Sequence, residues 1–109
     1  MKQYEIWWAD LPEPIGRRPV LLLSRDSAYA YLSGVIVVEI TSTIRDIPVE
    51  LRLGSSEGLK HPSVANFDNL HVVPKRLLAT RVGTLRHSRT AEAKRALGFA
   101  LGWPELKNL

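Results

Sequence analysis

Two arginines, Arg17 and Arg18, directly precede an apolar run that begins at Pro19 in the segment GRRPVLLLSRD. A guanidinium group can bind phosphate oxygens through two parallel hydrogen bonds, so either side chain could hold an anionic ligand at the start of a strand. Charged residues at a strand end can also be solvated groups that protect the edge of a sheet. The residue types therefore support two interpretations, a cationic ligand site and a pair of solvent-facing charges.

Three histidines, His61, His71 and His87, are the other side chains suited to moving a proton near neutral pH. They lie ten and sixteen residues apart, without an HExxH motif or a compact cluster with carboxylates, so neither a metal site nor a cofactor is expected. The spacing leaves open whether two of them converge as an acid and base pair or lie apart on the surface. The chain has no nucleotide-binding glycine-rich loop and no cysteine for thiol catalysis.

The composition indicates one globular domain with a basic surface. A chain of 109 residues suffices for a single hydrophobic core, so one domain over residues 1–109 is expected. The net charge is +4, and ten of the fifteen basic residues are arginine, which makes polyanions plausible partners. No apolar run approaches the roughly 18 residues of a membrane span, and no export signal is visible. We therefore expect a cytoplasmic protein without membrane contact.

The first half of the chain has the pattern of short strands. Residues 4–10 predict a strand, and the breaker-rich LPEPIG that follows predicts a loop. Because neighbouring side chains in a strand face opposite ways, we expect one of Trp7 and Trp8 in the core and the other facing a partner or ligand. The Val/Leu run of residues 19–24 predicts a strand buried on both faces, and residues 34–43 give the strongest strand pattern.

The second half adds more strands and one helix. Residues 48–54 alternate like a half-exposed strand, residues 62–73 predict one or two short strands, and ATRVGTL predicts a last one. From Ser88 the apolar residues follow helical spacing, with Ser88 or Thr90 as the expected cap and Gly102 and Pro104 at the end. This order favours a small, strongly curved antiparallel sheet or barrel with a terminal helix packed on it.

The segment EIWWADLPEPIGRRPVLLLSRD, residues 5–26, resembles the start of the MazF/PemK family of toxin endoribonucleases. The likeness lies in an acidic residue, a short aromatic strand, ADL, a loop and an RPV strand, in that order. VVEITST resembles the family's third strand, and SVANFDNLHVVPKRLL and VGTL resemble later segments. The resemblance implies a mainly β, SH3-like barrel of the CcdB/PemK kind with a C-terminal helix. It also implies a type II toxin that cleaves single-stranded RNA at short motifs without a metal, inhibiting translation and growth.

Two residues match the family's active-site pattern. Arg18, directly before the proline, matches its arginine, and Thr41, at the end of the third strand, matches its threonine. RNA cleavage without a metal proceeds by attack of the 2′-oxygen on the adjacent phosphate, which places negative charge on the phosphoryl oxygens. A guanidinium and a hydroxyl can both bind that charge. We therefore expect Arg18 and Thr41 to be catalytic.

Further side chains are candidates for holding the RNA, either by phosphate contact or by base stacking. The candidates for substrate binding are Arg17, Arg25, Trp7, Tyr29 and Glu13, with Arg81 and Arg86 as further phosphate contacts. Glu13 is the only ionisable side chain of the first loop, where some family members carry a histidine, and the general base and acid stay unassigned. The resemblance also implies a homodimer and an acidic, partly disordered antitoxin that blocks the RNA groove.

Two other function classes fit the same fold. One is a non-catalytic toxin that poisons DNA gyrase, as CcdB proteins do; the tail LGWPELKNL with Trp103 invites that comparison because the gyrase poisons use their last helix. The other is an SH3-like RNA-binding module without catalysis, which would bind RNA in a salt-sensitive manner and release no products. The Arg18 segment favours the ribonuclease.

Overall fold

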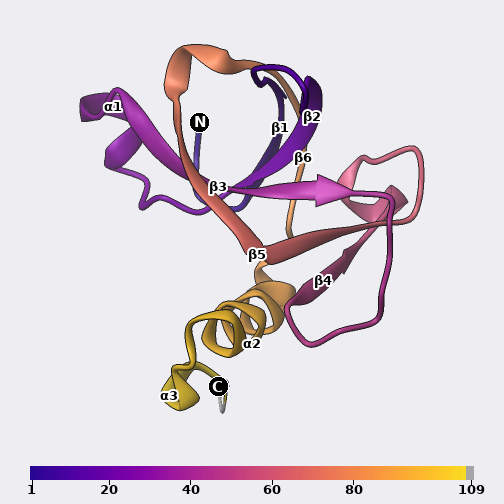
Figure 1. Ribbon diagram of the computed structural model, residues 1–109. Helices are drawn as coiled ribbons and strands as arrows, with labels where there is room; N and C mark the ends of the chain where they lie inside the picture. Colours follow the sequence, from indigo (N-terminus) through magenta and orange to yellow (C-terminus); the bar gives the residue numbers. More distant parts are fainter. Residues whose placement is uncertain (108–109) are drawn as a thin grey trace.

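The computed structural model describes residues 1–107 and contains six strands that form one antiparallel sheet in the order β4-β5-β3-β2-β1-β6. The strands are β1 Glu5–Asp10, β2 Arg17–Leu22, β3 Gly34–Thr41, β4 Glu50–Leu53, β5 Ser63–Pro74 and β6 Leu78–Thr84. The helices are α1 Ala28–Tyr31, α2 Thr90–Leu101 and α3 Pro104–Lys107, with 3-10 turns η1 Ser55–Glu57, η2 Lys75–Leu77 and η3 His87–Arg89. The sheet curls into a half-barrel, and α2 packs next to β4 and β5 (Figure 1).

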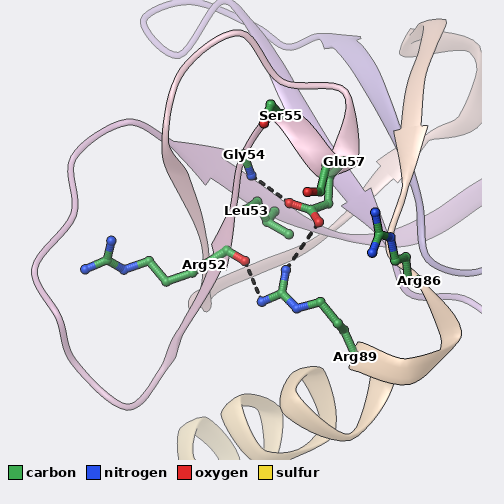
Figure 2. A pocket seen from close by; sticks show the side chains of 8 residues that line it. Arg52, Leu53, Gly54, Ser55, Glu57, Arg86 and Arg89 are labelled. Carbon is green, nitrogen blue, oxygen red and sulfur yellow. Dashed lines mark hydrogen bonds and ion pairs between the residues drawn. The ribbon is translucent and has the colours of Figure 1, made fainter.

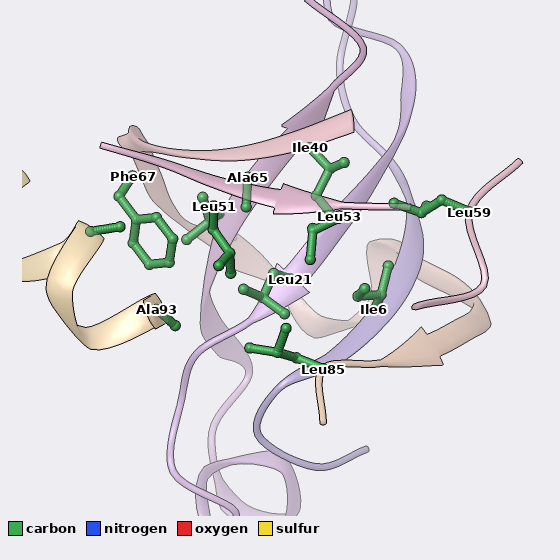
Figure 3. Close-up of a cluster of buried hydrophobic side chains, with 12 residues drawn as sticks. Ile6, Leu21, Ile40, Leu51, Leu53, Leu59, Ala65, Phe67, Leu85 and Ala93 are labelled. Carbon is green, nitrogen blue, oxygen red and sulfur yellow. The ribbon is translucent and has the colours of Figure 1, made fainter. Parts of the chain in front are cut away.

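Both faces of the sheet centre are buried, because successive side chains of β2 and β3 enter two different clusters. Leu21 and Ile40 belong to a cluster that also contains Ala93 of α2 (Figure 3). Val20 and Val37 belong to the second cluster, on the opposite face. This arrangement confirms the predicted two-sided burial of the Val/Leu run. It also means that the face to which a β2 side chain points depends on whether its number is odd or even.

The long strand β5 contains an irregularity that explains the ambiguous sequence pattern. Val38 pairs with Leu70 and Ile40 pairs with Ala65, so the residues between Ala65 and Leu70 do not follow the β3 ladder. The Asn66 side chain accepts a hydrogen bond from the backbone N–H of Asp68 at 2.9 Å, a local turn that competes with regular pairing. The bend lets the first part of β5 pair with both β3 and β4.

The helix ends differ in part from the sequence prediction. Arg89 is the residue before α2, and no side chain caps the first turn; the Thr90 hydroxyl instead donates to the His87 carbonyl at 3.0 Å. The prediction of a Ser88 or Thr90 cap was therefore wrong. Gly102, with φ of 69°, ends α2 as predicted. Pro104 lies beyond the end of α2 and is also the first residue of α3, a helix that the sequence analysis did not predict.

Within residues 1–107, no helix is long and apolar enough to cross a membrane.

Candidate active site

The strand β2 begins at Arg17, two residues before its predicted start, so Arg17 and Arg18 both lie inside it and leave its backbone on opposite sides. The Arg17 guanidinium donates to Asp10 Oδ1 at 2.9 Å and stacks over the Trp8 ring, 5.1 Å from its centre. The Arg18 guanidinium donates from Nη1 to Glu39 Oε1 at 3.2 Å. The two arginines, equivalent by composition, thus have different surroundings.

Glu39 is a charged residue in strand β3, whose other residues carry no charge, and it is bound from two sides. Its side chain is only 9% exposed; Oε1 accepts from Arg18, and Oε2 is hydrogen-bonded to His71 Nε2 of β5. A buried carboxylate requires such partners, because leaving it unpaired away from water is costly. Arg18, Glu39 and His71 therefore form a connected row across β2, β3 and β5.

Arg18 and Thr41 share one end of the β2–β3 ladder. Val20 pairs with Glu39 in the antiparallel ladder. Arg18 lies two residues before Val20 and Thr41 lies two residues after Glu39, so both are at the same end of the ladder and on the same face of the sheet. The backbone N–H of Thr43 donates to Thr41 Oγ1 at 3.2 Å. This bond uses the oxygen as an acceptor and leaves the hydroxyl proton of Thr41 available to a ligand.

Both candidates line one cavity of about 540 Å³. Its wall combines three cationic or ionisable groups beyond Arg18 with hydroxyls and apolar side chains. The lining residues are Trp8, Arg17, Arg18, Pro19, Ile40, Thr41, Ser42, Gly58, Leu59, Lys60, His61, Ser63 and Val82. Guanidinium, ammonium and hydroxyl donors around one hollow suit a ligand rich in phosphate oxygens.

This fold and sequence have clear relatives. Residues 2–101 match a family model that is described as "PemK-like, MazF-like toxin of type II toxin-antitoxin system". The chain belongs to this family. The toxin is 38% identical over 104 residues to probable endoribonuclease MazF2 of Mycobacterium tuberculosis H37Rv, a match that covers 94% of this chain and 99% of the relative. Probable endoribonuclease MazF5 of the same strain is 37% identical over 98 residues, which is 89% of each chain.

Solved structures agree with these relatives. Mycobacterium tuberculosis toxin MazF-mt6 superimposes on the toxin with a TM-score of 0.85 at 33% identity, covering 90% of this chain and 96% of that one. A mycobacterial endoribonuclease solved in complex with its cognate antitoxin has a TM-score of 0.84 at 28% identity, covering 95% and 97%. These matches confirm the family resemblance and the predicted mainly β barrel with a C-terminal helix.

The two aromatic candidates of the toxin lie away from the cavity. Trp7 packs partly buried against the second core cluster, and its indole N–H donates to Glu5 Oε1 at 3.0 Å. Tyr29 is 8% exposed, and its hydroxyl donates to the Ser24 carbonyl at 2.9 Å. Burial, together with the charges of Asp26 and Glu5, raises the pKa of this hydroxyl. Trp8, not Trp7, lines the cavity, so the two tryptophans differ in environment as predicted.

The remaining candidates are also outside the cavity. Arg25 is exposed and its Nε donates to the Ser27 hydroxyl at 3.0 Å, while Glu13 lies exposed in the loop between β1 and β2. Arg81 pairs with Glu5 at 3.2 Å. The structure thus gathers Arg17, Arg18 and Thr41 and leaves the other candidates dispersed.

A second cavity, of about 350 Å³, lies between β4, η1 and the start of α2, and Arg86 is part of its wall (Figure 2). The charged side chains around this cavity connect η1 and β4 to the start of α2. Glu57 accepts from the Gly54 backbone N–H at 2.7 Å and from Arg89 Nη1 at 3.3 Å. Arg89 also donates to the Arg52 carbonyl at 2.7 Å. The hydrogen bond to Glu92 raises the pKa of Arg89, and Glu57 adds to that effect. This cluster therefore braces α2 against the sheet.

Glu39, the partner of Arg18, is the residue that the sequence analysis missed, and His71 was considered there only as one of three histidines, without its partner. The available pattern for Glu39 was a lone acidic residue in the strand, directly between Val38 and Ile40. His71 had no local pattern, because its partner lies 32 residues earlier in the chain. Among residues 1–107, no group of three or more histidines and carboxylates is placed to hold a metal ion.

Proposed function

We propose that the toxin is an endoribonuclease that cleaves single-stranded RNA at short sequence motifs, without a metal, and thereby inhibits translation and growth in the cytoplasm. The chain acts as one toxin domain. The observation that carries this function is the shared cavity of Arg18 and Thr41, in a chain that is 38% identical to a protein named an endoribonuclease.

The chemistry follows from the donors around the cavity. A 2′-oxygen attacks the adjacent phosphorus, the bond to the 5′-oxygen breaks, and negative charge accumulates on the non-bridging oxygens. Arg18 has one nitrogen occupied by Glu39, and its other N–H donors can bind those oxygens. The Thr41 hydroxyl adds a hydrogen bond from the adjacent strand. The products would be a 2′,3′-cyclic phosphate and a 5′-hydroxyl.

Arg17 has a supporting role in this proposal. Its guanidinium is more exposed than that of Arg18 and is held by Asp10 and the Trp8 ring. A charge in that position can attract and orient the RNA backbone without entering the reaction. Arg25 contributes at most a distant phosphate contact.

We further propose a symmetric homodimer and an acidic, partly disordered antitoxin as partner. An exposed apolar strip on β3 and β5, formed by the register pair Ile36 and Val72 and by Leu70, supports the dimer, because a second copy would shield it from water. A basic chain and the cationic cavity support an acidic partner. A related mycobacterial endoribonuclease was solved with its cognate antitoxin.

The decisive experiment incubates purified toxin with RNAs of diverse sequence in EDTA and analyses the ends of the fragments. We expect cleavage at a short motif, with cyclic phosphate at one end and hydroxyl at the other. Arg18→Ala should lose cleavage, and Lys94→Ala, which removes a surface charge on α2, should keep it. Intact RNA throughout, or cleavage that requires added metal, would contradict the proposal.

A further inference from the structure

The row formed by Arg18, Glu39 and His71 contains a group that the proposed reaction lacks, a proton acceptor. The side chains of Arg18 and His71 are 35% and 37% exposed, whereas the Glu39 side chain between them is 9% exposed. The two outer groups are therefore accessible to a ligand, and the carboxylate that links them is not.

The hydrogen bond to Glu39 determines which nitrogen of His71 carries the proton. An ionised carboxylate only accepts hydrogen bonds, so the bond between Glu39 Oε2 and His71 Nε2 places the proton on Nε2. Nδ1 then keeps its lone pair and can accept a proton. A carboxylate that orients an imidazole in this way also stabilises the imidazolium that forms when the ring takes up a proton.

The same carboxylate sets the distance between His71 and the group that would bind phosphate. Arg18 Nη1 lies 3.2 Å from Oε1, and His71 Nε2 binds Oε2 of the same group, so one carboxyl group separates the guanidinium from the imidazole. All three side chains lie on one face of the sheet, since Val20 pairs with Glu39 and Val37 pairs with His71. A phosphate bound by the remaining N–H donors of Arg18 on this face would therefore lie on the same side of the sheet as the imidazole.

We propose that His71 is a catalytic residue of the toxin, the general base that accepts the 2′-hydroxyl proton, and that Glu39 is the positioning residue that orients both His71 and Arg18. This assignment rests on the proposed ribonuclease function and adds the proton acceptor to it. Nδ1 takes the proton as the 2′-oxygen forms its bond to phosphorus. The bond between phosphorus and the 5′-oxygen breaks, and the departing oxygen takes a proton from water. His71 then returns its proton to solvent.

The sharpest test is His71→Gln, because a glutamine side chain keeps an N–H donor for Glu39 but cannot accept the proton. We expect single-turnover cleavage to slow by about 100-fold or more, the range of general base catalysis. Binding of a 2′-deoxy analogue of the substrate should stay close to that of the wild-type toxin. His87→Gln in η3 is the matched control, because His87 is exposed and distant in sequence from the row.

A second variant, His71→Ala, distinguishes proton transfer by His71 from a purely structural role of its hydrogen bond to Glu39. Free imidazole should restore part of its cleavage rate in proportion to the imidazole concentration. A His71→Gln toxin that cleaves at the wild-type rate, or a His71→Ala toxin whose rate stays flat in imidazole, would overturn the role of His71. Wild-type toxin that leaves every RNA intact would instead overturn the ribonuclease function, and the His71 role with it.

Discussion

Arg18 and Glu39, 21 residues apart in the chain, are joined by an ion pair of 3.2 Å across β2 and β3. The Glu39 carboxylate binds one nitrogen of the Arg18 guanidinium, and the other N–H donors of that group can bind a ligand. The flexible Arg18 side chain is thus held at its guanidinium end, which favours binding of a phosphate in one orientation.

Replacing Arg18 should remove the main phosphate donor. We expect Arg18→Ala to lower the cleavage rate constant by about 10² to 10³-fold, as loss of one oxyanion donor does. Arg18→Lys should recover little, because an ammonium group cannot make the paired contacts of a guanidinium. Single-turnover assays measure both variants, and urea unfolding shows whether the unpaired Glu39 also lowers stability. Wild-type cleavage by a folded Arg18→Ala toxin would exclude Arg18 from the site.

Removing the charge of Glu39 should disturb Arg18 without removing it. Glu39→Gln keeps the size of the side chain and one hydrogen-bond acceptor, but it weakens the hold on the guanidinium and on His71. We expect cleavage to fall by up to about 10²-fold, the effect of a misplaced catalytic group, with a smaller change in RNA affinity. A loss of RNA affinity with an unchanged cleavage rate at saturating toxin would indicate that Glu39 acts on binding alone.

The Thr41 hydroxyl can be tested with two substitutions of similar size. Thr41→Val removes the hydroxyl and should slow cleavage roughly tenfold, the value of one hydrogen bond. Thr41→Ser keeps the hydroxyl and should stay near the wild-type rate. Both rates are measured on the same RNA. Similar rates for the two variants would show that the hydroxyl takes no part.

Leu21 lies at the centre of the first core cluster and is fully buried. Leu21→Ala should lower the free energy of unfolding by about 2 to 5 kcal/mol, because the cavity it leaves adds to the lost burial. Urea titration followed by circular dichroism measures the change. Leu101→Ala, on an exposed part of α2, is the control and should change stability far less.

The ion pair of Arg89 and Glu92 should make a small, pH-dependent contribution to stability. The Arg89 hydrogen bond lowers the pKa of Glu92 in the folded toxin. The stabilisation is therefore complete above the normal glutamate pKa of about 4.3 and is lost as the pH falls through the lowered value. Solvent screens this partly exposed pair, so we expect less than about 1 kcal/mol.

The comparison that isolates it measures the free energy of unfolding of wild type and Glu92→Gln at pH 7 and at pH 3. The gap between the two proteins should shrink at the lower pH. A gap that widens on acidification would contradict the assigned direction.

The sequence by itself was enough to predict most elements. Runs such as VLLL and GVIVV specify strands because β-branched and apolar residues favour a pleated, buried surface wherever they occur. The helical spacing before Gly102 specified the C-terminal helix for the same local reason. The RPV segment and the strand that ends in Thr41 carried the family resemblance, and this resemblance led to the prediction that Arg18 and Thr41 are catalytic.

Only the tertiary structure separated Arg17 from Arg18 and brought Glu39 to His71. The two arginines point to opposite sides because both lie inside β2, whose pairing with β1 extends to Arg17 and does not begin at Pro19. The contact between Glu39 and His71 depends on the β3–β5 register, which the bend after Ala65 shifts. Local preferences act over a few residues, whereas register is set by the packing of strands distant in the chain, and that packing decided the site.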